Sequence, residues 1–244
     1  MSFYRITHNQ KYDFATLHNW GCTFHCPFCS YKLRGGRSGF AYPEPERFLT
    51  VEEQKAALSG VRPGKVYFMG GEPTVAKEIR EMIRFAKCEL GAFTKLGHTN
   101  GSNLQLGYLD AANIGFKAWD EDLHLKLTGR PKSLIFDNFS RAFDSGMQLS
   151  ASMIYIPGLI GLDEMEGVLK YLAALDKNIP FHIMGYIPVP GLEYERPTDS
   201  QMAEAMSLCK SFLTNVGASH LTPEEALDLT SRDDRFDVTV IAGV

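Results

Sequence analysis

The sequence lacks any long apolar run, because no stretch approaches the ~20 residues needed to span a bilayer. Its first residues, from Met1 to Arg5, also lack the apolar core of a signal peptide. Neither sign of charge dominates, since 25 basic and 29 acidic residues give a formal net charge of −4, and no broad basic face is evident. These absences predict a cytoplasmic protein with neither a membrane nor a nucleic acid as its partner.

Cysteine is scarce and unevenly placed: of five cysteines in 244 residues, three lie within eight positions. An odd number cannot pair completely in disulfides, and a tight group in a reducing compartment is typical of a metal site. The chain also lacks a Gly-x-Ser-x-Gly element, a phosphate-binding loop and paired carboxylates at a telling spacing. The cysteines are therefore the first candidates for chemistry.

What the sequence does contain is a regular alternation of short apolar runs and helical patterns. With 44% hydrophobic residues, the chain can bury the core of one domain, with or without a small appendage. Alternating strands and helices indicate a parallel sheet, and six units predict a partial (β/α)6 TIM-like barrel, open on one side. The predicted strands are Phe14–Trp20, Lys65–Met69, Phe93–Thr99, Asn113–Ala118, Met147–Ile156 and Phe181–Ile187.

Helices are expected between these strands. The first begins at Thr50, which forms a capping box with Glu53, and the others cover Val75–Leu90, Asp120–Leu127, Lys132–Ser145, Leu162–Asp176 and Thr198–Val216. The alternation ends after Val216, although a short helix at Thr222 and a strand at Val238–Ile241 are indicated. We therefore expect a barrel over residues 1–217 and a C-terminal tail, residues 218–244, that packs on it.

The three grouped cysteines are Cys22, Cys26 and Cys29, directly after the first predicted strand. Thiolates bind iron and zinc well, and three of them leave one iron of a four-iron cluster without a protein ligand. An open metal position usually indicates chemistry. A structural zinc site with His25 as fourth ligand is the alternative, whereas Cys88 and Cys209 fit small buried positions in helices.

The Cys-x3-Cys-x2-Cys spacing, with the aromatic Phe28 before the last cysteine, resembles the signature of the radical S-adenosylmethionine superfamily. The resemblance implies a [4Fe–4S] cluster whose open iron binds S-adenosyl-L-methionine, with Phe28 near the adenine. It also implies an electron donor, flavodoxin or ferredoxin, and reductive cleavage to a 5′-deoxyadenosyl radical that abstracts hydrogen from a substrate.

A second motif, Gly70-Gly71-Glu72, follows the second predicted strand. Two glycines let the backbone approach a ligand closely, and a carboxylate can accept hydrogen bonds from an ammonium group. An ordinary strand-to-helix turn is the alternative, with Pro73 opening the helix. In this position the motif resembles the superfamily element that holds the amino group of S-adenosylmethionine.

Later motifs narrow the resemblance to the activating enzymes of pyruvate formate-lyase and other glycyl radical enzymes. Thr99-Asn100-Gly101 resembles a turn at the end of their third strand, and Lys117 corresponds to a lysine that pairs with the carboxylate of S-adenosylmethionine. A solvated lysine at a strand end is the alternative for Lys117. The resemblance covers about residues 15–215.

Four positions depart from these activating enzymes. His98 and Gly115 stand where the family often has aspartates of a monovalent-cation site, which predicts that this site is missing or rebuilt. Ser152 and Ile187 stand where family members have an arginine and a histidine that contact S-adenosylmethionine. Ser152 stays a candidate contact, and fewer charged side chains are expected to hold the cofactor.

The sequence therefore predicts a radical S-adenosylmethionine oxidoreductase. One candidate substrate is a glycine of a glycyl radical enzyme, a protein that could approach the open side of a short barrel. A small molecule or peptide is the alternative, since 7-carboxy-7-deazaguanine synthase also has an abbreviated barrel. The hypothesis from another class is an iron–sulfur or zinc protein with a binding or electron-transfer role, against which Glu72 and Lys117 argue.

Overall fold

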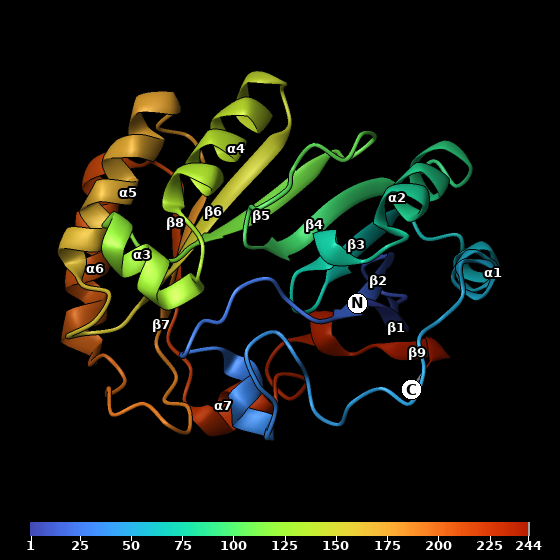
Figure 1. Cartoon of the computed structure of the whole chain (residues 1–244), viewed down its shortest axis with the longest axis horizontal. Coiled ribbons are helices and arrows are strands. Elements are labelled where there is room, and N and C mark those ends of the chain that lie inside the picture. Colours follow the sequence, from blue (N-terminus) through green and yellow to red (C-terminus); the bar gives the residue numbers. More distant parts are fainter. Residues whose placement is uncertain (244) are drawn as a thin grey trace.

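The inner wall of the molecule is one curved nine-stranded sheet in the order β8-β7-β6-β5-β4-β3-β2-β1-β9 (Figure 1). The computed structural model describes residues 1–243. The strands are β1 (Ser2–Asn9), β2 (Phe14–Trp20), β3 (Lys65–Met69), β4 (Phe93–Thr99), β5 (Ala111–Phe116), β6 (Gln148–Tyr155), β7 (Phe181–Gly185), β8 (Val216–Ser219) and β9 (Thr239–Gly243).

Neighbouring strands from β2 to β8 are parallel, whereas β1 is antiparallel to both β2 and β9. The predicted partial barrel, open on one side, is confirmed, and all six predicted strands are present. Two strands were missed. The predicted helix to Val216 ends at Phe212 instead, where the chain turns into the short strand β8. Strand β1 was not predicted at all, although Phe3 and Ile6 are completely buried.

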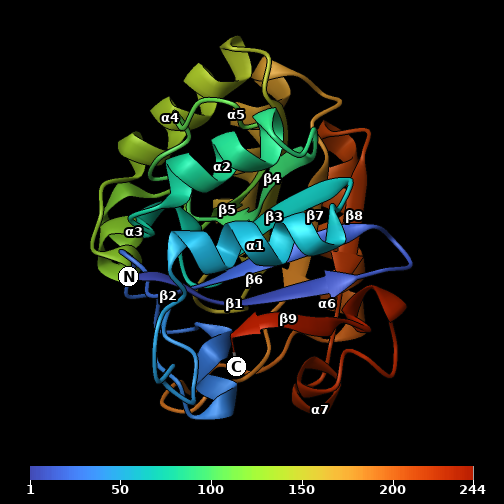
Figure 2. The same cartoon turned by 90° about the vertical axis from the view of Figure 1, so that its right-hand side faces the viewer.

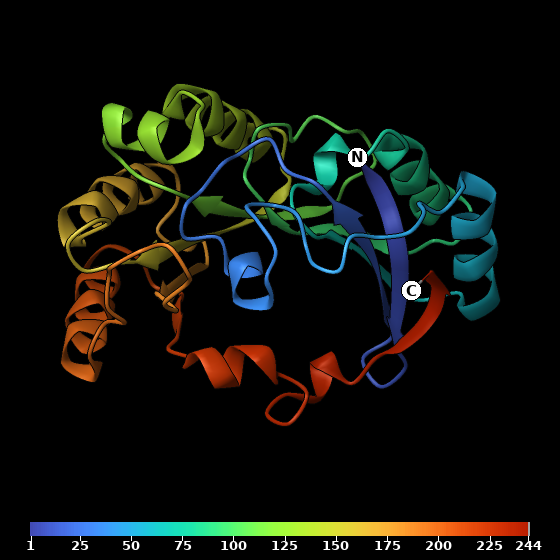
Figure 3. The same ribbon diagram turned by 60° about the horizontal axis from the view of Figure 1, so that its bottom comes forward.

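Helices cover the convex side of the sheet, as Figures 1 and 3 show. The capping box predicted at Thr50 is formed, and α2 begins only after a 3-10 turn, η2 (Pro73–Val75). None of the helices described in residues 1–243 is long and apolar enough to cross a membrane. They are α1 (Val51–Val61), α2 (Ile79–Cys88), α3 (Glu121–Thr128), α4 (Lys132–Asp144), α5 (Leu162–Leu175), α6 (Asp199–Phe212) and α7 (Pro223–Leu227).

The apolar core lies between the sheet and these helices. Side chains alternate along a strand, so Leu17, Phe68 and Ile114 point toward the helices and are completely buried. Burial of each such side chain contributes about 1.5–3 kcal/mol relative to exposure. The intervening side chains of the same strands consequently face the concave side, where polar residues are found.

The C-terminal segment crosses the open side of the barrel and brings β9 back beside β1 (Figures 2 and 3). On the way, the Leu227 carbonyl accepts a 2.8 Å hydrogen bond from Arg34, in the 3-10 turn η1 (Ser30–Arg34). Asn9 Nδ2 donates to three carbonyls around the 3-10 turn η3 (Asp234–Phe236), including that of Asp234 at 2.9 Å. A boundary between residues 217 and 218 stays a prediction, and β8 runs across it.

Candidate cofactor site

The three grouped cysteines lie on the loop that leaves the C-terminal end of β2. Cys26 is buried, Cys22 and Cys29 are partly accessible, and all three are free thiols. Among the described residues no three Cys, His, Asp or Glu side chains are placed to hold one metal ion. A four-iron cluster binds each thiolate to a different iron, so its ligands need not converge on one point.

Hydrogen-bond donors reach two of the three sulfur atoms, those of Cys22 and Cys29. The Phe24 amide donates to Cys22 Sγ at 3.3 Å, and the Gly39 amide donates to Cys29 Sγ at 3.4 Å. Asn100 Nδ2 lies 3.8 Å from Cys22 Sγ. Burial raises the pKa of Cys26 to about 11 and also raises the pKa of Cys22. The thiols must lose their protons to bind a metal, and at buried positions this requires compensating positive charge. The N–H donors suit sulfur atoms that bind a cluster.

The glycine motif after β3 packs directly against the cysteine loop. The Glu72 amide donates to the Gly21 carbonyl at 2.8 Å, and the Gly71 amide donates to Tyr31 Oη at 3.0 Å. Gly71 has a φ of 51°, and a Cβ there would lie 2.0 Å from the Gly21 oxygen and 2.6 Å from the Gly39 oxygen. Only glycine fits between these two backbones. The two motifs therefore form one interlocked unit.

Glu72 joins this unit to the end of β4. Its carboxylate is completely buried and accepts hydrogen bonds from Thr74 Oγ1 at 2.6 Å, Thr99 Oγ1 at 2.8 Å and the Asn100 amide at 2.6 Å. Burial raises the pKa of Glu72, and these donors oppose the rise. A carboxylate has about four acceptor positions. Since the chain's own donors fill most of them, Glu72 braces the Thr99-Asn100 turn beneath the cysteine loop.

Asn19 was missed by the sequence reasoning. Its Nδ2 donates to three carbonyls, those of Gly21 at 2.9 Å, Gly70 at 3.2 Å and Glu72 at 2.9 Å. A single buried amide thus connects the cysteine loop to the glycine motif. No spacing rule marks an asparagine before a cysteine motif, and only its place near the end of an apolar strand could have drawn attention to it.

Lys117, Gly115 and Ser152 meet on the opposite side of the barrel rim. A Cβ on Gly115 would lie 2.8 Å from Lys117 Nζ and 3.8 Å from Ser152 Oγ, so the absence of a side chain makes room for the ammonium group. The positive charge of Lys117 opposes the rise that burial causes in the pKa values of Cys22 and Cys26. Ser152 is buried, and its hydroxyl has only a long 3.5 Å contact, to the Ile114 carbonyl.

His98 faces the concave side because of an irregularity in β4. The pairing of β4 with β5 shifts between Leu96 and Thr99, and such bulges re-aim side chains. The Asn113 amide lies 3.3 Å from His98 Nδ1. Desolvation of the ring, followed by the charges of Lys117, Lys95 and His182, lowers the pKa of His98, although the residue is exposed at the surface. A neutral histidine thus occupies the position at which the activating enzymes often have an aspartate.

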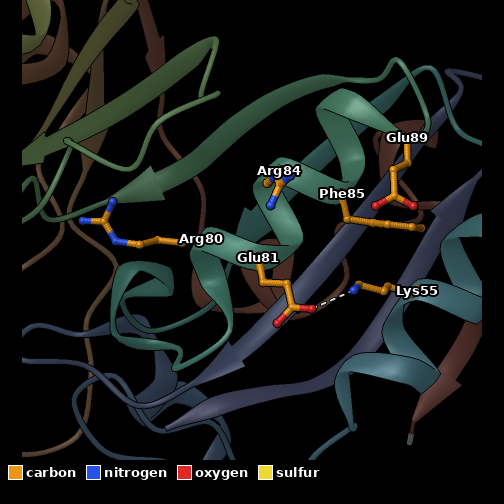
Figure 4. A pocket seen from close by; sticks show the side chains of 6 residues that line it. All are labelled: Lys55, Arg80, Glu81, Arg84, Phe85 and Glu89. Atoms are coloured by element: carbon orange, nitrogen blue, oxygen red, sulfur yellow. Dashed lines mark hydrogen bonds and ion pairs between the residues drawn. The ribbon is translucent and has the colours of Figure 1, made fainter.

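The remaining predicted residue, Phe28, belongs to the cysteine loop itself, and its side chain is buried in the core. The structure therefore gathers the cysteines, Gly70–Glu72, Thr99, Asn100 and Lys117 at one rim, while their roles as ligands stay predictions. A shallow depression elsewhere lies on the outer surface between α1 and α2, where Lys55 pairs with Glu81 at 2.6 Å (Figure 4). It is separate from this rim.

Comparison with known proteins gives one family. The family model described as "Radical SAM superfamily" matches residues 17–172. The chain is 28% identical over 223 residues to the Methanocaldococcus jannaschii protein named "Putative glycyl-radical enzyme activating enzyme MJ1632", covering 88% of this chain and 84% of that protein.

Solved structures with the same fold are more distant in sequence. Streptococcus suis SuiB bound to S-adenosylmethionine superposes with a TM-score of 0.62 at 16% identity, over 83% of this chain and 48% of SuiB. SuiB has also been solved with its precursor peptide SuiA. A domain of pyruvate-formate lyase-activating enzyme from Bacteroides vulgatus gives a TM-score of 0.53 at 16% identity, over 64% of this chain and 99% of that domain. The chain spans about half the length of SuiB.

Proposed function

The chain belongs to the radical S-adenosylmethionine superfamily, and on that premise we propose that Cys22, Cys26 and Cys29 bind a [4Fe–4S] cluster. The observation that carries this proposal is the set of N–H donors directed at the Cys22 and Cys29 sulfurs, on a loop interlocked with the glycine motif. When bound, the cluster and S-adenosylmethionine supply reductive cleavage of the sulfonium and abstraction of a substrate hydrogen.

The residues around the cysteines would position S-adenosylmethionine. The backbone of Gly70 and Gly71, packed against Asn19 and Gly21, would meet its amino group, with Glu72, Thr99 and Asn100 holding that backbone and the neighbouring turn in place. Lys117 would pair with the carboxylate, and Phe28 would pack near the adenine. Ser152, beside the Lys117 ammonium, is the weakest of the proposed contacts.

We propose a glycine of a glycyl radical enzyme as the first candidate substrate, supported by the name of the M. jannaschii relative. A small molecule or an extended peptide is the second candidate. One observation favours it: the C-terminal segment crosses the open side by which a large folded partner would reach the concave face (Figure 3). Flavodoxin or ferredoxin is the proposed electron donor in either case.

Anaerobic reconstitution tests this function. Purified protein is loaded with iron and sulfide, reduced with dithionite and given S-adenosylmethionine, and 5′-deoxyadenosine is measured by chromatography. We expect about four irons per chain and accumulation of 5′-deoxyadenosine. A fully loaded cluster that yields none would contradict the proposal.

A second measurement separates the two candidate substrates. The loaded enzyme is mixed with each glycyl radical enzyme of the source organism, and a glycyl-radical signal is sought by electron paramagnetic resonance. A signal on one partner protein identifies an activating enzyme. Abundant 5′-deoxyadenosine with no such signal favours a small molecule or peptide.

A further inference from the structure

Asn100 provides the only side-chain N–H group in the described part of the chain that reaches a sulfur atom of the cysteine motif. Its Nδ2 lies 3.8 Å from Cys22 Sγ and 3.1 Å from Thr23 Oγ1, so it contacts the cysteine loop at two adjacent residues. The other two donors to these sulfur atoms are the backbone amides of Phe24 and Gly39. A backbone amide is present whatever the side chain, whereas the contact from Asn100 depends on this one residue.

The orientation of the Asn100 side-chain amide is fixed by its own bonds. The Ser102 backbone amide donates to Asn100 Oδ1 at 2.9 Å. Because a backbone N–H group cannot accept a hydrogen bond, the oxygen must lie on that side, and exchange of the two amide atoms is excluded. The NH2 group is therefore the end that faces Cys22 and Thr23.

The turn that carries Asn100, at the end of β4, is bonded from two sides. Asn100 is buried, and its backbone amide donates to the Glu72 carboxylate at 2.6 Å. Asn138, from α4, donates to the carbonyls of Gly101 and Ser102, both at 2.9 Å. Neither set of bonds uses the side-chain NH2 group of Asn100. The turn is thus held by other groups, and this NH2 group stays directed at the cysteine loop.

We propose that Asn100 is a positioning residue for electron transfer, whose N–H···S contact with Cys22 raises the reduction potential of the bound cluster. The inference rests on the proposed function, because that function places the cluster on Cys22, Cys26 and Cys29. It gives the Asn100 side chain a role toward the cluster, in addition to the part that its backbone has in the turn beneath the cysteine loop.

The direction of the effect follows from charge. Reduction adds one electron, supplied by the electron donor, to the cluster and its thiolates, and no bond forms or breaks in this step. A hydrogen-bond donor stabilises the more negative form, so the reduced state gains more from the Asn100 amide than the oxidised state does. Asn100 is buried, so water screens this preference only weakly. The same electron donor therefore reduces a larger fraction of the enzyme when Asn100 is present.

A redox titration of the reconstituted protein tests this assignment. The midpoint potential of the cluster is measured anaerobically from its visible absorption, without S-adenosylmethionine. We expect Asn100→Asp, which keeps the shape of the side chain and removes its NH2 donor, to make reduction about tenfold less favourable, equivalent to about 59 mV for one electron. Asn100→Ala should shift the midpoint in the same direction by a smaller amount, because it adds no negative charge.

Asn138→Ala is the matched control. This variant removes a buried amide that braces the same turn and whose bonds go to backbone carbonyls, not to a sulfur atom. It should lower the free energy of unfolding, measured with urea, and leave the midpoint potential as it is in the natural protein. If Asn138→Ala shifted the midpoint as much as Asn100→Asp does, the role of Asn100 would be only structural.

A spectroscopic measurement covers the case in which the Asn100 variants bind no cluster. In the natural protein labelled with 15N-asparagine, pulsed electron paramagnetic resonance of the reduced cluster should detect a coupled 15N nucleus. Absence of that coupling, or equal midpoints in the natural protein and Asn100→Asp, would overturn the assignment. Neither result changes the iron content or 5′-deoxyadenosine formation of the natural protein, whereas failure of the proposed function shows in those two measurements.

Discussion

The two sides of the barrel rim are built differently. On the side of β2, β3 and β4, three loops interlock through buried hydrogen bonds, and Asn19 and Glu72 each join several of them. On the side of β5, β6 and β7, Lys117 and Ser152 stand with few partners of their own. The first side is organised before any ligand binds. The second side contains polar groups with which a ligand could form hydrogen bonds or ion pairs.

The difference coincides only in part with where the chain departs from the activating enzymes it resembles, because His98 departs from them and lies on β4, on the first side. Cys22, Gly71 and Glu72 match the superfamily, and their contacts are made within the protein. Gly115 and Ser152 depart from it and lie on the side with few internal bonds. The side of the rim that is already hydrogen-bonded within the protein limits which cofactor can bind. The side with few internal bonds can differ between enzymes that act on different substrates. The following four predictions probe this contrast, beginning with the largest effect.

Cys26→Ala is expected to abolish both the cluster and 5′-deoxyadenosine formation, because only two thiolates would be left in the loop. Iron and sulfide content and the visible absorption of reconstituted protein measure the loss. Cys88→Ala is the matched control and should load normally, since Cys88 lies in α2 and is exposed, not buried as the sequence suggested. A full cluster in Cys26→Ala would refute the proposed ligand set.

Gly71→Ala should destabilise the fold by roughly 2–5 kcal/mol, since it combines overpacking with a left-handed backbone. Urea unfolding provides the measurement. Gly91→Ala is a stringent control: φ there is 70°, but nothing lies within 4 Å of the added Cβ. We expect only about 1–2 kcal/mol from that backbone strain. Equal losses in the two variants would show that the loops are not tightly interlocked.

Lys117→Met should weaken S-adenosylmethionine binding about tenfold or more while the cluster still forms, because a charge-assisted bond to the carboxylate would be lost. Equilibrium dialysis against reconstituted protein measures the affinity. Lys126→Met, on the outer helix α3, provides the control for loss of a lysine charge. Unchanged affinity in Lys117→Met would mean that this ammonium serves another ligand.

Ser152→Ala should have the smallest effect, less than about threefold in S-adenosylmethionine affinity and under about 1 kcal/mol in the free energy of unfolding. Its hydroxyl makes only a 3.5 Å contact, which is too long for a strong bond. The same dialysis and urea measurements apply. A tenfold loss of affinity would instead make Ser152 a principal contact, and the two sides of the rim would then be more alike.

Motifs that depend on local chain chemistry could be predicted from the sequence. The strands β2, β3 and β4 have the predicted bounds, because their apolar runs are flanked by clear turn residues. The cysteine, glycine and Thr99-Asn100 motifs lie together because parallel strands end at one edge.

Features that depend on tertiary pairing could not be predicted. Strand β1 forms because β2 and β9 supply partners on both sides, and β8 is a short run of four residues, VGAS, without a strong apolar pattern. The bulge that turns His98 inward and the three bonds of Asn19 likewise arise from contacts distant in sequence. No local spacing encodes them.

The pairing of β9 with β1 also sets an order of events during synthesis. Strand β1 is made first, and its outer neighbour is made last of the described residues. The C-terminal segment therefore cannot bridge the open side of the barrel until translation has passed residue 243. The loop with Cys22, Cys26 and Cys29 is synthesised long before that, so it lies beside an uncovered concave face until β9 pairs with β1.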